Sequence, residues 1–480
     1  MKIYSSAQIR AWDAATIHRE PVTPEALIER ASLAFVGKFQ QLFPDTLLPV
    51  AVVCGPGNNG ADGQAVAKLL QQAGYGVAVW VPETDDVVPH PFFSSNAVVV
   101  DALFGTGLNR PLTGRWEQVV NQINALPNTV VSIDIPSGLP ADGVVFGALV
   151  QADYTIAFER PKLSFFFPEN ALALGKWFVV PIGLLPAYEA ETDTPYHLTD
   201  LATARSMIRP RNTFAHKGVY GHALLVAGAY GKMGAAVLAA KGALRAGVGL
   251  LSVHTPRCGN IVLQTAVPEA MHQPDDRARM LTHVPDTTPF DAVGVGPGIG
   301  QAPETAAALF NLLRQANRPM VLDADALNLL GLHPDWWPLI PKESILTPHP
   351  KEFERLFGKT ANSLEQLEVQ MEKSASLGVI LVRKGAYTAV STPDGLVCFN
   401  TTGNPGMATG GSGDVLTGIL TALLAQGYAP ADAARLGVYL HGLAGDLAAE
   451  AQSQEALIAS DMPEHLGKAF LLLHGNSPIA

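Results

Sequence analysis

The sequence contains few cysteines, no metal-binding cysteine pattern and no long apolar run. Cys54, Cys258 and Cys398 lie far apart, without CxxC or Cys/His spacing, which argues against disulfides and favours reduced thiols in the cytosol. Residues 1–10 contain no apolar core of a signal peptide, and no uninterrupted apolar stretch reaches the length of a membrane span. These absences predict a soluble, cytoplasmic protein that does not use a membrane as a partner.

Positive charge is also scarce. The chain has 32 Lys and Arg against 43 Asp and Glu, a formal net charge of -11. This balance argues against nucleic acid as a partner, although it permits a local basic pocket for the phosphates of a small ligand. Apolar residues make up 48% of the chain and glycine is abundant, as is typical of α/β proteins whose sheets are covered by helices on both faces.

The stretch Asn404–Ile419 runs from a glycine-dense turn into an apolar helix expected over 414–424. Backbone N–H groups at such a helix start stabilise a phosphate or a developing oxyanion. Asp414 would repel a bound anion there unless it takes a proton from an attacking hydroxyl. The alternative is that Asp414 is only a first-turn helix residue with a favourable dipole interaction, and the glycine run alone leaves both interpretations open.

The first half reads as two helices followed by a strand and helix alternation. Strands are expected at Pro49–Cys54, Gly76–Trp80, Ala97–Gly107, Thr129–Gly138, Ala152–Ala157 and Lys176–Val180. Because parallel strands bring their carboxyl ends together, Asp101 and Asp134 should share a rim with the glycine loop Gly55–Gly63. A single aspartate at a strand end ordinarily caps a turn, but three polar strand ends beside glycines favour a ligand site. In that loop, Asn58, Asn59 and Asp62 add oxygens for a hard cation or a ribose.

Residues 181–195 lose periodicity and gather proline and acidic residues, which places a domain boundary near residue 190. The second half repeats the pattern of strand, glycine loop and helix, beginning at His222–Ala227. Asp323 and Asp325 are expected on one side of a strand over 320–327, where one should pair with a cation, a substrate or a backbone amide.

Two further residues are candidates for ligand contact. His349 lies between two prolines and Lys384 follows an apolar strand. On a ligand rim they suit substrate and phosphate contact, respectively; the alternatives are a structural histidine and an ordinary lysine between strand and turn.

These motifs together carry a resemblance to known families. Gly55–Gly63, Asp101–Leu108 and Asp134–Gly138 resemble the NAD(P)HX epimerase domain. Four further motifs resemble the dehydratase of the same hydrate, a ribokinase-like domain: His216–Gly218, Gly296–Gly300, Leu346–Pro350 and Asn404–Asp414. The resemblance implies two doubly wound α/β/α domains, a Rossmann-like epimerase over 1–190 and a ribokinase-like dehydratase over 191–480, in the order of bifunctional bacterial nicotinamide-nucleotide repair enzymes.

The implied activity is the repair of NADH or NADPH hydrated at the nicotinamide ring. The first domain would epimerise the hydroxyl-bearing carbon, with Asp134 as the candidate acid and base. The second would dehydrate the S form at the expense of ADP or ATP with Mg²⁺, through a phosphorylated intermediate, with Asp414 as the base. The small-molecule partners are thus NADHX or NADPHX and the nucleotide, and a homo-oligomer is expected.

The resemblance also assigns binding residues. Potassium would be held in the first domain by Asn59, Asp101 and Ser137. The hydrate would contact Asn58, Asn59, Gly60, Ala61, Asp62, Gly105, Thr106, Gly107, Leu108, Asn109, Arg110, Pro111 and Asp134 in the first domain, and Ala235, Gly298, His349 and Asp414 in the second. The nucleotide would lie against Lys384, Gly385, Ala386, Tyr387, Thr388, Asn404, Pro405, Gly406, Met407, Ala408, Thr409, Gly410, Gly411, Ser412 and Gly413.

Two competing interpretations remain from the residues. The Gly-Ser-Gly-Asp turn also suits a ribokinase-superfamily kinase of a vitamin precursor or sugar. The first domain could also be a non-catalytic nucleotide-binding or scaffolding module, although its Asn59, Asp101 and Asp134 argue against that alternative.

Overall fold

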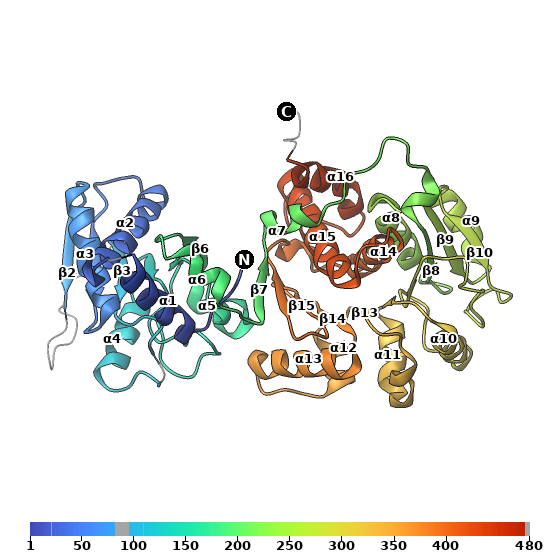
Figure 1. Ribbon diagram of the computed structural model, residues 1–480, viewed down its shortest axis with the longest axis horizontal. Coiled ribbons are helices and arrows are strands. Elements are labelled where there is room, and N and C mark those ends of the chain that lie inside the picture. Colours follow the sequence, from blue (N-terminus) through green and yellow to red (C-terminus); the bar gives the residue numbers. More distant parts are fainter. Residues whose placement is uncertain (21, 82–95, 109, 476–480) are drawn as a thin grey trace. The chain divides into compact units, whose positions relative to one another are not determined.

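The computed structural model describes residues 1–20, 22–81, 96–108 and 110–475 (Figure 1). The chain divides into two compact units, one comprising Lys2–Tyr196 and the other beginning at His197. The boundary predicted near residue 190 falls in α6 (Pro186–Glu191), shortly before this division. Each unit is built around its own mainly parallel sheet, so the predicted α/β class is confirmed.

The first unit has a six-stranded parallel sheet in the order β2-β1-β3-β4-β5-β6. Its strands are β1 (Val50–Cys54), β2 (Val77–Trp80), β3 (Val98–Ala102), β4 (Val130–Ile133), β5 (Tyr154–Phe158) and β6 (Lys176–Val180). Its helices are α1 (Ser6–Arg19), α2 (Pro24–Leu42), α3 (Asn58–Gln72), α4 (Arg115–Asn124) and α5 (Ala171–Leu174), besides α6, with the 3₁₀ turns η1 (Leu163–Phe166) and η2 (Pro168–Asn170).

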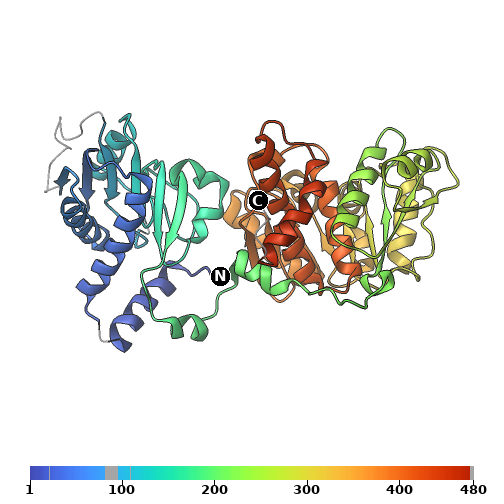
Figure 2. The same cartoon turned by 90° about the horizontal axis from the view of Figure 1, so that it is seen from above.

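Both faces of this sheet are buried, as the apolar strands require. Val52 and Cys54 of β1 belong to the core cluster shared with α2 and α3, whereas Val53 belongs to the cluster under α4. The alternation follows from the two-residue period of a strand. Figure 2 shows α1 and α2, in dark blue, on one side of the sheet. At the N-terminus of α1, Ser5 and Gln8 form a capping box.

The glycine loop after β1 is shorter than predicted. The loop was expected over Gly55–Gly63, but α3 begins at Asn58, with Gly57 as its N-cap. The helix can start this early because Gly60 packs directly on the backbone of Gly55, where an added Cβ would lie 1.8 Å from the carbonyl oxygen. The amide-bearing side chains of Asn58 and Asn59 are therefore at a helix N-terminus on the rim of the sheet.

The second unit has a ten-stranded sheet in the order β10-β9-β8-β11-β12-β13-β14-β15-β16-β7. Its strands are β7 (Tyr196–Thr199), β8 (His222–Val226), β9 (Leu250–Thr255), β10 (Met271–Pro274), β11 (Ala292–Val295), β12 (Met320–Leu322), β13 (Ile345–Leu346), β14 (Ile380–Arg383), β15 (Ala389–Ser391) and β16 (Val397–Asn400). The pairs from β10 to β14 are parallel, and β15 pairs antiparallel with both β14 and β16.

Helices cover both faces of this sheet as well, with α8, α14 and α15 on one side and α10 and α11 on the other (Figure 1). The helices are α7 (Leu201–Met207), α8 (Met233–Arg245), α9 (Gly259–Ala266), α10 (Pro303–Gln315), α11 (Asp325–Leu332), α12 (Pro350–Phe357), α13 (Ser363–Leu377), α14 (Ser412–Ala425), α15 (Pro430–Gln452) and α16 (Asp461–Leu473), with the 3₁₀ turns η3 (Lys217–Tyr220), η4 (Pro334–Leu339) and η5 (Pro405–Met407).

Two glycines let α8 and α14 touch backbone to backbone. A Cβ on Gly418 of α14 would lie 1.9 Å from the carbonyl oxygen of Ala239, and one on Gly242 of α8 would lie 2.5 Å from that of Val415. Any side chain at either position would separate the helices. The contact fixes the spacing of the two helices whose N-termini face the predicted site.

The prediction that Asp323 and Asp325 lie on one strand is wrong. β12 ends at Leu322, Ala324 has a positive φ of 50°, and Asp325 begins α11. The left-handed residue breaks the strand period, so the two carboxylates have separate partners. Asp323 pairs with Lys384, while Asp325 accepts from the Gly300 amide and pairs with Lys232.

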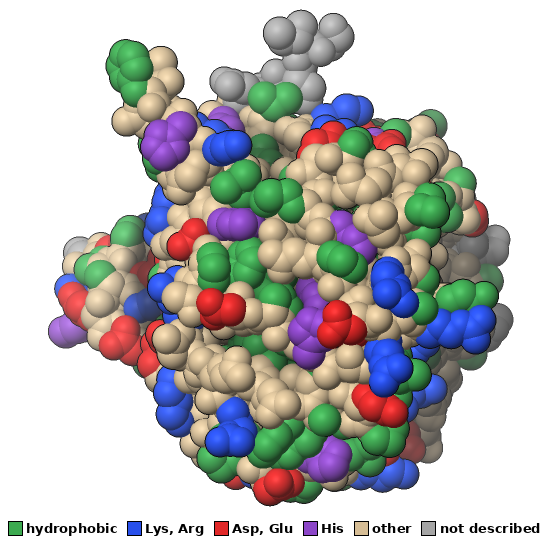
Figure 3. Space-filling view, turned by 90° about the vertical axis from the view of Figure 1, so that its right-hand side faces the viewer, with side chains coloured by type: hydrophobic (Ala, Val, Ile, Leu, Met, Phe, Trp, Pro, Cys, Tyr) green, Lys and Arg blue, Asp and Glu red, His purple; other side chains and the backbone are tan. Residues whose placement is uncertain are grey.

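Two observations bear on the expected partners. Among the described helices, none joins the length and apolar character that crossing a membrane requires. On the face seen in Figure 3, acidic and basic side chains are interspersed.

Candidate functional sites

The first unit contains a cavity of about 630 Å³ at the carboxyl ends of its strands. Residues from α1 and α2, such as Ile9 and Leu27, form one wall, and the start of α3 with the segments after β3, β4 and β5 forms the other. A ligand pocket at this edge is what an open parallel sheet provides.

The cavity collects most of the residues predicted for the hydrate. Its lining includes Asn58, Asn59, Asp62, Gly105, Thr106, Gly107, Leu108, Arg110 and Asp134. Three predicted residues do not line the cavity: Gly60 and Ala61, which lie in the first turns of α3, and Pro111, which lies in the segment after β3. Asn109 lies outside the described residues. The separate motifs thus meet in one pocket.

Asp134 is held in place by a lysine that sequence reasoning missed. Its backbone has a positive φ of 64°, and its Oδ1 accepts from the Phe158 amide at 2.9 Å and from Lys162 Nζ at 2.5 Å. Lys162 is only 2% exposed and also donates to the carbonyls of Phe158 and Arg160, both at 3.1 Å. In the sequence it follows Arg160-Pro161 in an ordinary-looking turn, so only the fold reveals its contact.

Two other carboxyls of the cavity have raised pKa values. Burial, together with the charges of Asp134 and Asp13, raises the pKa of Asp62 to about 8. Burial and the charge of Asp134 raise the pKa of Asp13 on α1 to about 6, although Lys162 opposes the change. Asp13 was not among the residues singled out from the sequence, because it lies on α1, far from any motif. The cavity thus holds carboxyls that differ in protonation near neutral pH.

The predicted potassium ligands lie at the same rim. Asp101 is fully buried and accepts from Ser137 Oγ at 2.6 Å, from the Ser137 amide at 2.8 Å and from Ser132 Oγ at 2.8 Å. Burial raises the pKa of Asp101, and these hydrogen bonds oppose the change. Asn59 Nδ2 is buried without a hydrogen-bond partner. The set offers the oxygen donors of a carboxylate, a hydroxyl and an amide.

In the second unit, Asp414 lies in the first turn of α14. The N-cap of this helix is Gly411, which has a positive φ of 97°. Burial, with the nearby charge of Asp323, raises the pKa of Asp414 to about 6. A carboxyl with that pKa is mostly ionised at neutral pH. Its pKa is close enough to neutral pH for the group to accept and release a proton.

Lys384, which is half-buried, and Asp323, which is buried, form an ion pair beside this helix start. Lys384 Nζ lies 2.9 Å from Asp323 Oδ1, and Thr417 Oγ1 of α14 donates to Asp323 Oδ2 at 2.7 Å. A Cβ on Gly413 would lie 3.3 Å from Lys384 Nζ. The cation predicted for phosphate contact therefore borders the glycine turn. It is oriented by Asp323, one of the two aspartates expected to find a charged or polar partner, and Asp323 in turn is held by Thr417, which no motif indicated.

The three other residues predicted for the hydrate in this unit come from separate elements. Ala235 of α8 and Gly298 after β11 are in contact, since a Cβ on Gly298 would lie 3.0 Å from that of Ala235. His349 caps α12, with Nδ1 accepting from the Lys351 amide at 3.1 Å. This fixes the proton on Nε2 in the neutral ring. Burial and the nearby Lys384 lower the pKa of His349.

The turn predicted for the nucleotide is anchored on α15. Asp446 accepts from the Gly403 amide at 2.9 Å and from Asn404 Nδ2 at 3.0 Å, and Asn404 Oδ1 accepts from the Gly406 amide at 3.0 Å. Pro405, Gly406 and Met407 form η5, and Ala408, Thr409 and Gly410 lead to the α14 cap at Gly411 and its first residues, Ser412 and Gly413. The remaining predicted residues, Gly385, Ala386, Tyr387 and Thr388, join β14 to β15 next to Lys384.

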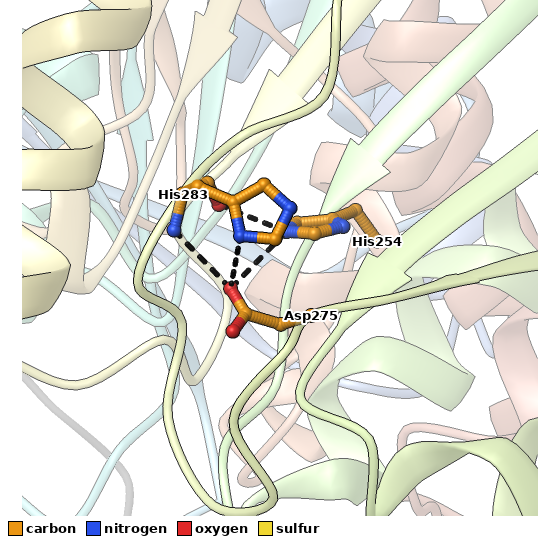
Figure 4. Close-up of side chains that lie close together, drawn as sticks. All are labelled: His254, Asp275 and His283. Atoms are coloured by element: carbon orange, nitrogen blue, oxygen red, sulfur yellow. Dashed lines mark hydrogen bonds and ion pairs between the residues drawn. The ribbon is translucent and has the colours of Figure 1, made fainter.

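A cluster outside these sites, His254, Asp275 and His283, has the composition of a metal site (Figure 4). Its polar atoms are already engaged, however. His254 Nδ1 lies 3.0 Å from the Gln273 carbonyl and Nε2 2.9 Å from the His283 carbonyl. Asp275 accepts from the amides of Arg277 at 2.8 Å and Thr282 at 2.7 Å. The cluster therefore clamps residues 275–283, because both ring nitrogens of His254 and both oxygens of Asp275 already have protein partners.

Two family models match the chain, one in each unit. The family model described as NAD(P)H-hydrate dehydratase matches residues 223–468. The model described as YjeF-related protein N-terminus matches residues 24–92 and 83–164. A bifunctional NAD(P)H-hydrate repair enzyme of Moorella thermoacetica is 34% identical, over 97% of this chain and 96% of its own. The enzyme of the same name from Coxiella burnetii is 32% identical, over 97% of this chain and 98% of its own.

Solved structures resemble the second unit. One is the ADP/ATP-dependent NAD(P)H-hydrate dehydratase of Bacillus subtilis, co-crystallised with ATP and Mg²⁺. It is 31% identical, has a TM-score of 0.51, and the match covers 58% of this chain and 98% of that chain. A ribokinase-like superfamily protein of Enterococcus faecalis is 26% identical, with a TM-score of 0.52 and coverage of 60% and 98%.

Proposed function

Because this chain belongs to the family of bifunctional NAD(P)H-hydrate repair enzymes, we propose that it returns hydrated NADH or NADPH to the reduced cofactor by two successive reactions. The observation that carries the proposal is the similarity over 97% of the chain to relatives that bear this name. It sets aside the alternative of a vitamin or sugar kinase and that of a non-catalytic first domain.

The first unit epimerises the hydroxyl-bearing carbon of the ring in its cavity. That carbon is bonded to the ring nitrogen, whose lone pair can expel the hydroxyl once it is protonated, and water can then return on either face. Asp134 takes part in the proton transfers of this exchange, because it lines the cavity and Lys162 fixes its carboxylate. The start of α3, with Asn58, Asn59 and Asp62, and the segment Gly105–Arg110 hold the remainder of the substrate.

Potassium is the cation that suits the donors of the first unit. Asp101, Ser137 and Asn59 would hold it, since their side-chain oxygens are hard donors that lie at the same rim. Its charge would keep Asp101 ionised against the effect of burial. Its structural part would be to join the start of α3 to the end of β3.

The second unit removes the hydroxyl of the S form. Hydroxide is a poor leaving group, so Asp414 takes the hydroxyl proton while the oxygen attacks the terminal phosphoryl group of ADP or ATP. The amides of the turn ending at Gly413 and the Lys384 ammonium stabilise the transferred charge. The ring nitrogen then expels phosphate, and loss of a proton from the neighbouring carbon restores the dihydronicotinamide ring.

The nucleotide occupies the rim between Lys384–Thr388 and Asn404–Gly413, with the hydrate against Ala235, Gly298 and His349. Two features support this arrangement: the glycine turn ends at the N-terminus of α14, where backbone amides suit a phosphate, and Lys384 borders the turn. The magnesium would arrive with the nucleotide and be held chiefly by its phosphates.

The assay that tests the function uses the purified full chain with separated R and S hydrates of NADH and of NADPH, each with ADP or ATP and Mg²⁺. We expect recovery of the dihydronicotinamide absorbance from the S form, and from the R form after epimerisation. The donor and hydrate that give the highest kcat/KM identify the preferred substrates. A stable phosphorylated product without recovered absorbance would contradict the proposal.

We further propose that the chain acts as a homo-oligomer in the cytoplasm. The free cysteines support a reducing compartment. Light scattering of the purified protein measures the oligomeric state, and a mass of one chain at micromolar concentration would contradict this part of the proposal.

A further inference from the structure

Four carboxyl groups line the cavity of the first unit around one buried cation. Asp13 comes from α1, Asp62 from α3, Asp134 follows β4 and Glu159 follows β5, while Lys162 is the buried cation. Arg10 and Arg110 also line the cavity, but both are exposed to solvent. So many acidic groups in one partly enclosed space cannot all be ionised without large repulsion.

Lys162 is committed to one of these carboxyls. It lies 2.5 Å from Asp134, and its other hydrogens go to two backbone carbonyls. Glu159 has its own partners, accepting from the Ile182 amide at 2.8 Å and pairing with Arg160 at 3.3 Å. Within the described part of the chain, Asp62 has no ion-pair partner, and the charges that help to raise its pKa are those of Asp134 and Asp13.

The contrast between Asp62 and Asp134 follows from these partners. Asp134 has a lysine that stabilises its ionised form, whereas Asp62 is half-buried and interacts with like charges. The raised pKa of Asp62, about 8, agrees with this arrangement and means that its carboxyl carries a proton at neutral pH. Two carboxyls of opposite protonation on one cavity form the usual arrangement of an acid with a base.

We propose that Asp62 is the general acid of the epimerisation, paired with the ionised Asp134 as the general base. This inference rests on the proposed function of the first unit. Asp62 donates its proton to the ring hydroxyl, the carbon–oxygen bond breaks, and the oxygen leaves as water while the ring nitrogen lone pair forms a double bond to the carbon. A water then adds to the opposite face and gives a proton to Asp134.

The cycle balances in protons and in water. After one turnover Asp62 is ionised and Asp134 protonated, which is the state required for the reverse reaction with the roles exchanged. Exchange with solvent returns the proton to Asp62. Lys162 is a positioning residue, because it contacts Asp134 and favours its ionised state between turnovers.

The test is the pH profile of kcat/KM for epimerisation, followed by separating the two hydrates in reactions without nucleotide. We expect the wild-type rate to fall as pH rises through about 8, because the acid loses its proton there. Asp62→Asn should reduce kcat by on the order of 100-fold or more and remove the fall at high pH, while dehydration of the S hydrate stays unchanged. Asp62→Glu should restore part of the rate and the alkaline fall.

Asp13→Asn is the matched comparison, because it removes a like charge from the same cavity. It should keep the alkaline fall but move it to lower pH, since the pKa of Asp62 drops without that neighbour. A carboxyl carbon NMR signal that titrates near pH 8 in the wild type and is missing in Asp62→Asn would assign the group without any assay of activity.

The outcomes separate the two levels of the proposal. A wild-type chain that does not epimerise overturns the proposed function of the first unit. A wild-type chain that epimerises, with Asp62→Asn folded by thermal unfolding and showing the same rate and alkaline fall, overturns the role of Asp62 alone. A carboxyl signal of Asp62 that titrates near pH 4 overturns it as well.

Discussion

At the scale of single residues, the ion pair of Asp134 and Lys162 joins catalysis to stability. The lysine is 2% exposed and depends on this carboxylate for its charge partner. A buried charge without its partner is strongly destabilising, whereas replacing both partners by neutral groups is often tolerated. The two contributions can therefore be separated by substitution.

Asp134→Asn should abolish epimerisation, leave dehydration unchanged and lower the free energy of unfolding of the first unit by about 3–5 kcal/mol. Adding Lys162→Met should restore much of that stability but none of the epimerisation. Urea unfolding and the epimerisation assay measure the two effects. Restored epimerisation in the double variant would mean that Asp134 matters only for folding.

The role of Asp414 as a base predicts that dehydration slows at low pH, whereas the role of Asp62 as an acid predicts that epimerisation slows at high pH. Its raised pKa, about 6, means that the ionised base is lost as pH falls through that value. The kcat/KM of dehydration should therefore decline about tenfold per pH unit well below 6. Asp414→Asn should lose on the order of 100-fold or more in dehydration and keep epimerisation. A flat acid limb in the wild type would contradict the role of base.

The sequence indicated some of these residues and could not indicate others. Asp134 stood out because it follows an apolar strand, and the parallel sheet then brings it to the rim with Asn59. Lys162 and Asp13 carry no local signal, since a lysine after a proline and an aspartate on a surface helix are common. Their burial beside Asp134 and Asp62 arises only when separate elements pack together.

At the scale of elements, strand positions were predictable and helix starts were less so. The apolar runs of β1, β3 and β4 are buried on both faces, as a continuous run of apolar residues predicts. The start of α3 at Asn58 depends on the contact of Gly60 with Gly55, which no local pattern encodes. The break after Asp323 likewise depends on the left-handed Ala324.

The close packing of α8 and α14 gives a prediction with a matched control. Gly418→Ala would place a methyl group 1.9 Å from the Ala239 carbonyl oxygen, so the helices must move apart. We expect a loss of about 1–3 kcal/mol in stability and a higher KM for the dehydration substrates, because both helix starts face the site. Gly467→Ala on α16 meets nothing within 4 Å and should stabilise by about 0.5–1 kcal/mol. Equal effects of the two substitutions would contradict this account.

At the scale of the whole molecule, each unit carries its own set of proposed catalytic groups. Full-length Asp134→Asn and Asp414→Asn chains should therefore complement each other when mixed. The mixture should convert the R hydrate to the reduced cofactor with ADP or ATP, while either variant alone gives only the spontaneous rate. Recovery of the dihydronicotinamide absorbance follows the reaction. No gain on mixing would mean that the intermediate does not pass between chains.

The clamp at His254, Asp275 and His283 also means that the backbone conformation of residues 276–283 depends on one carboxylate, that of Asp275. The segment follows β10, the edge strand of the larger sheet, and exposes Arg277 and Arg279. With Asp275 in place its backbone is tied down, so trypsin should cut there slowly; Asp275→Asn should release it and create a preferred cleavage site. Limited digestion, read by mass spectrometry, then reports on the integrity of this edge without any substrate.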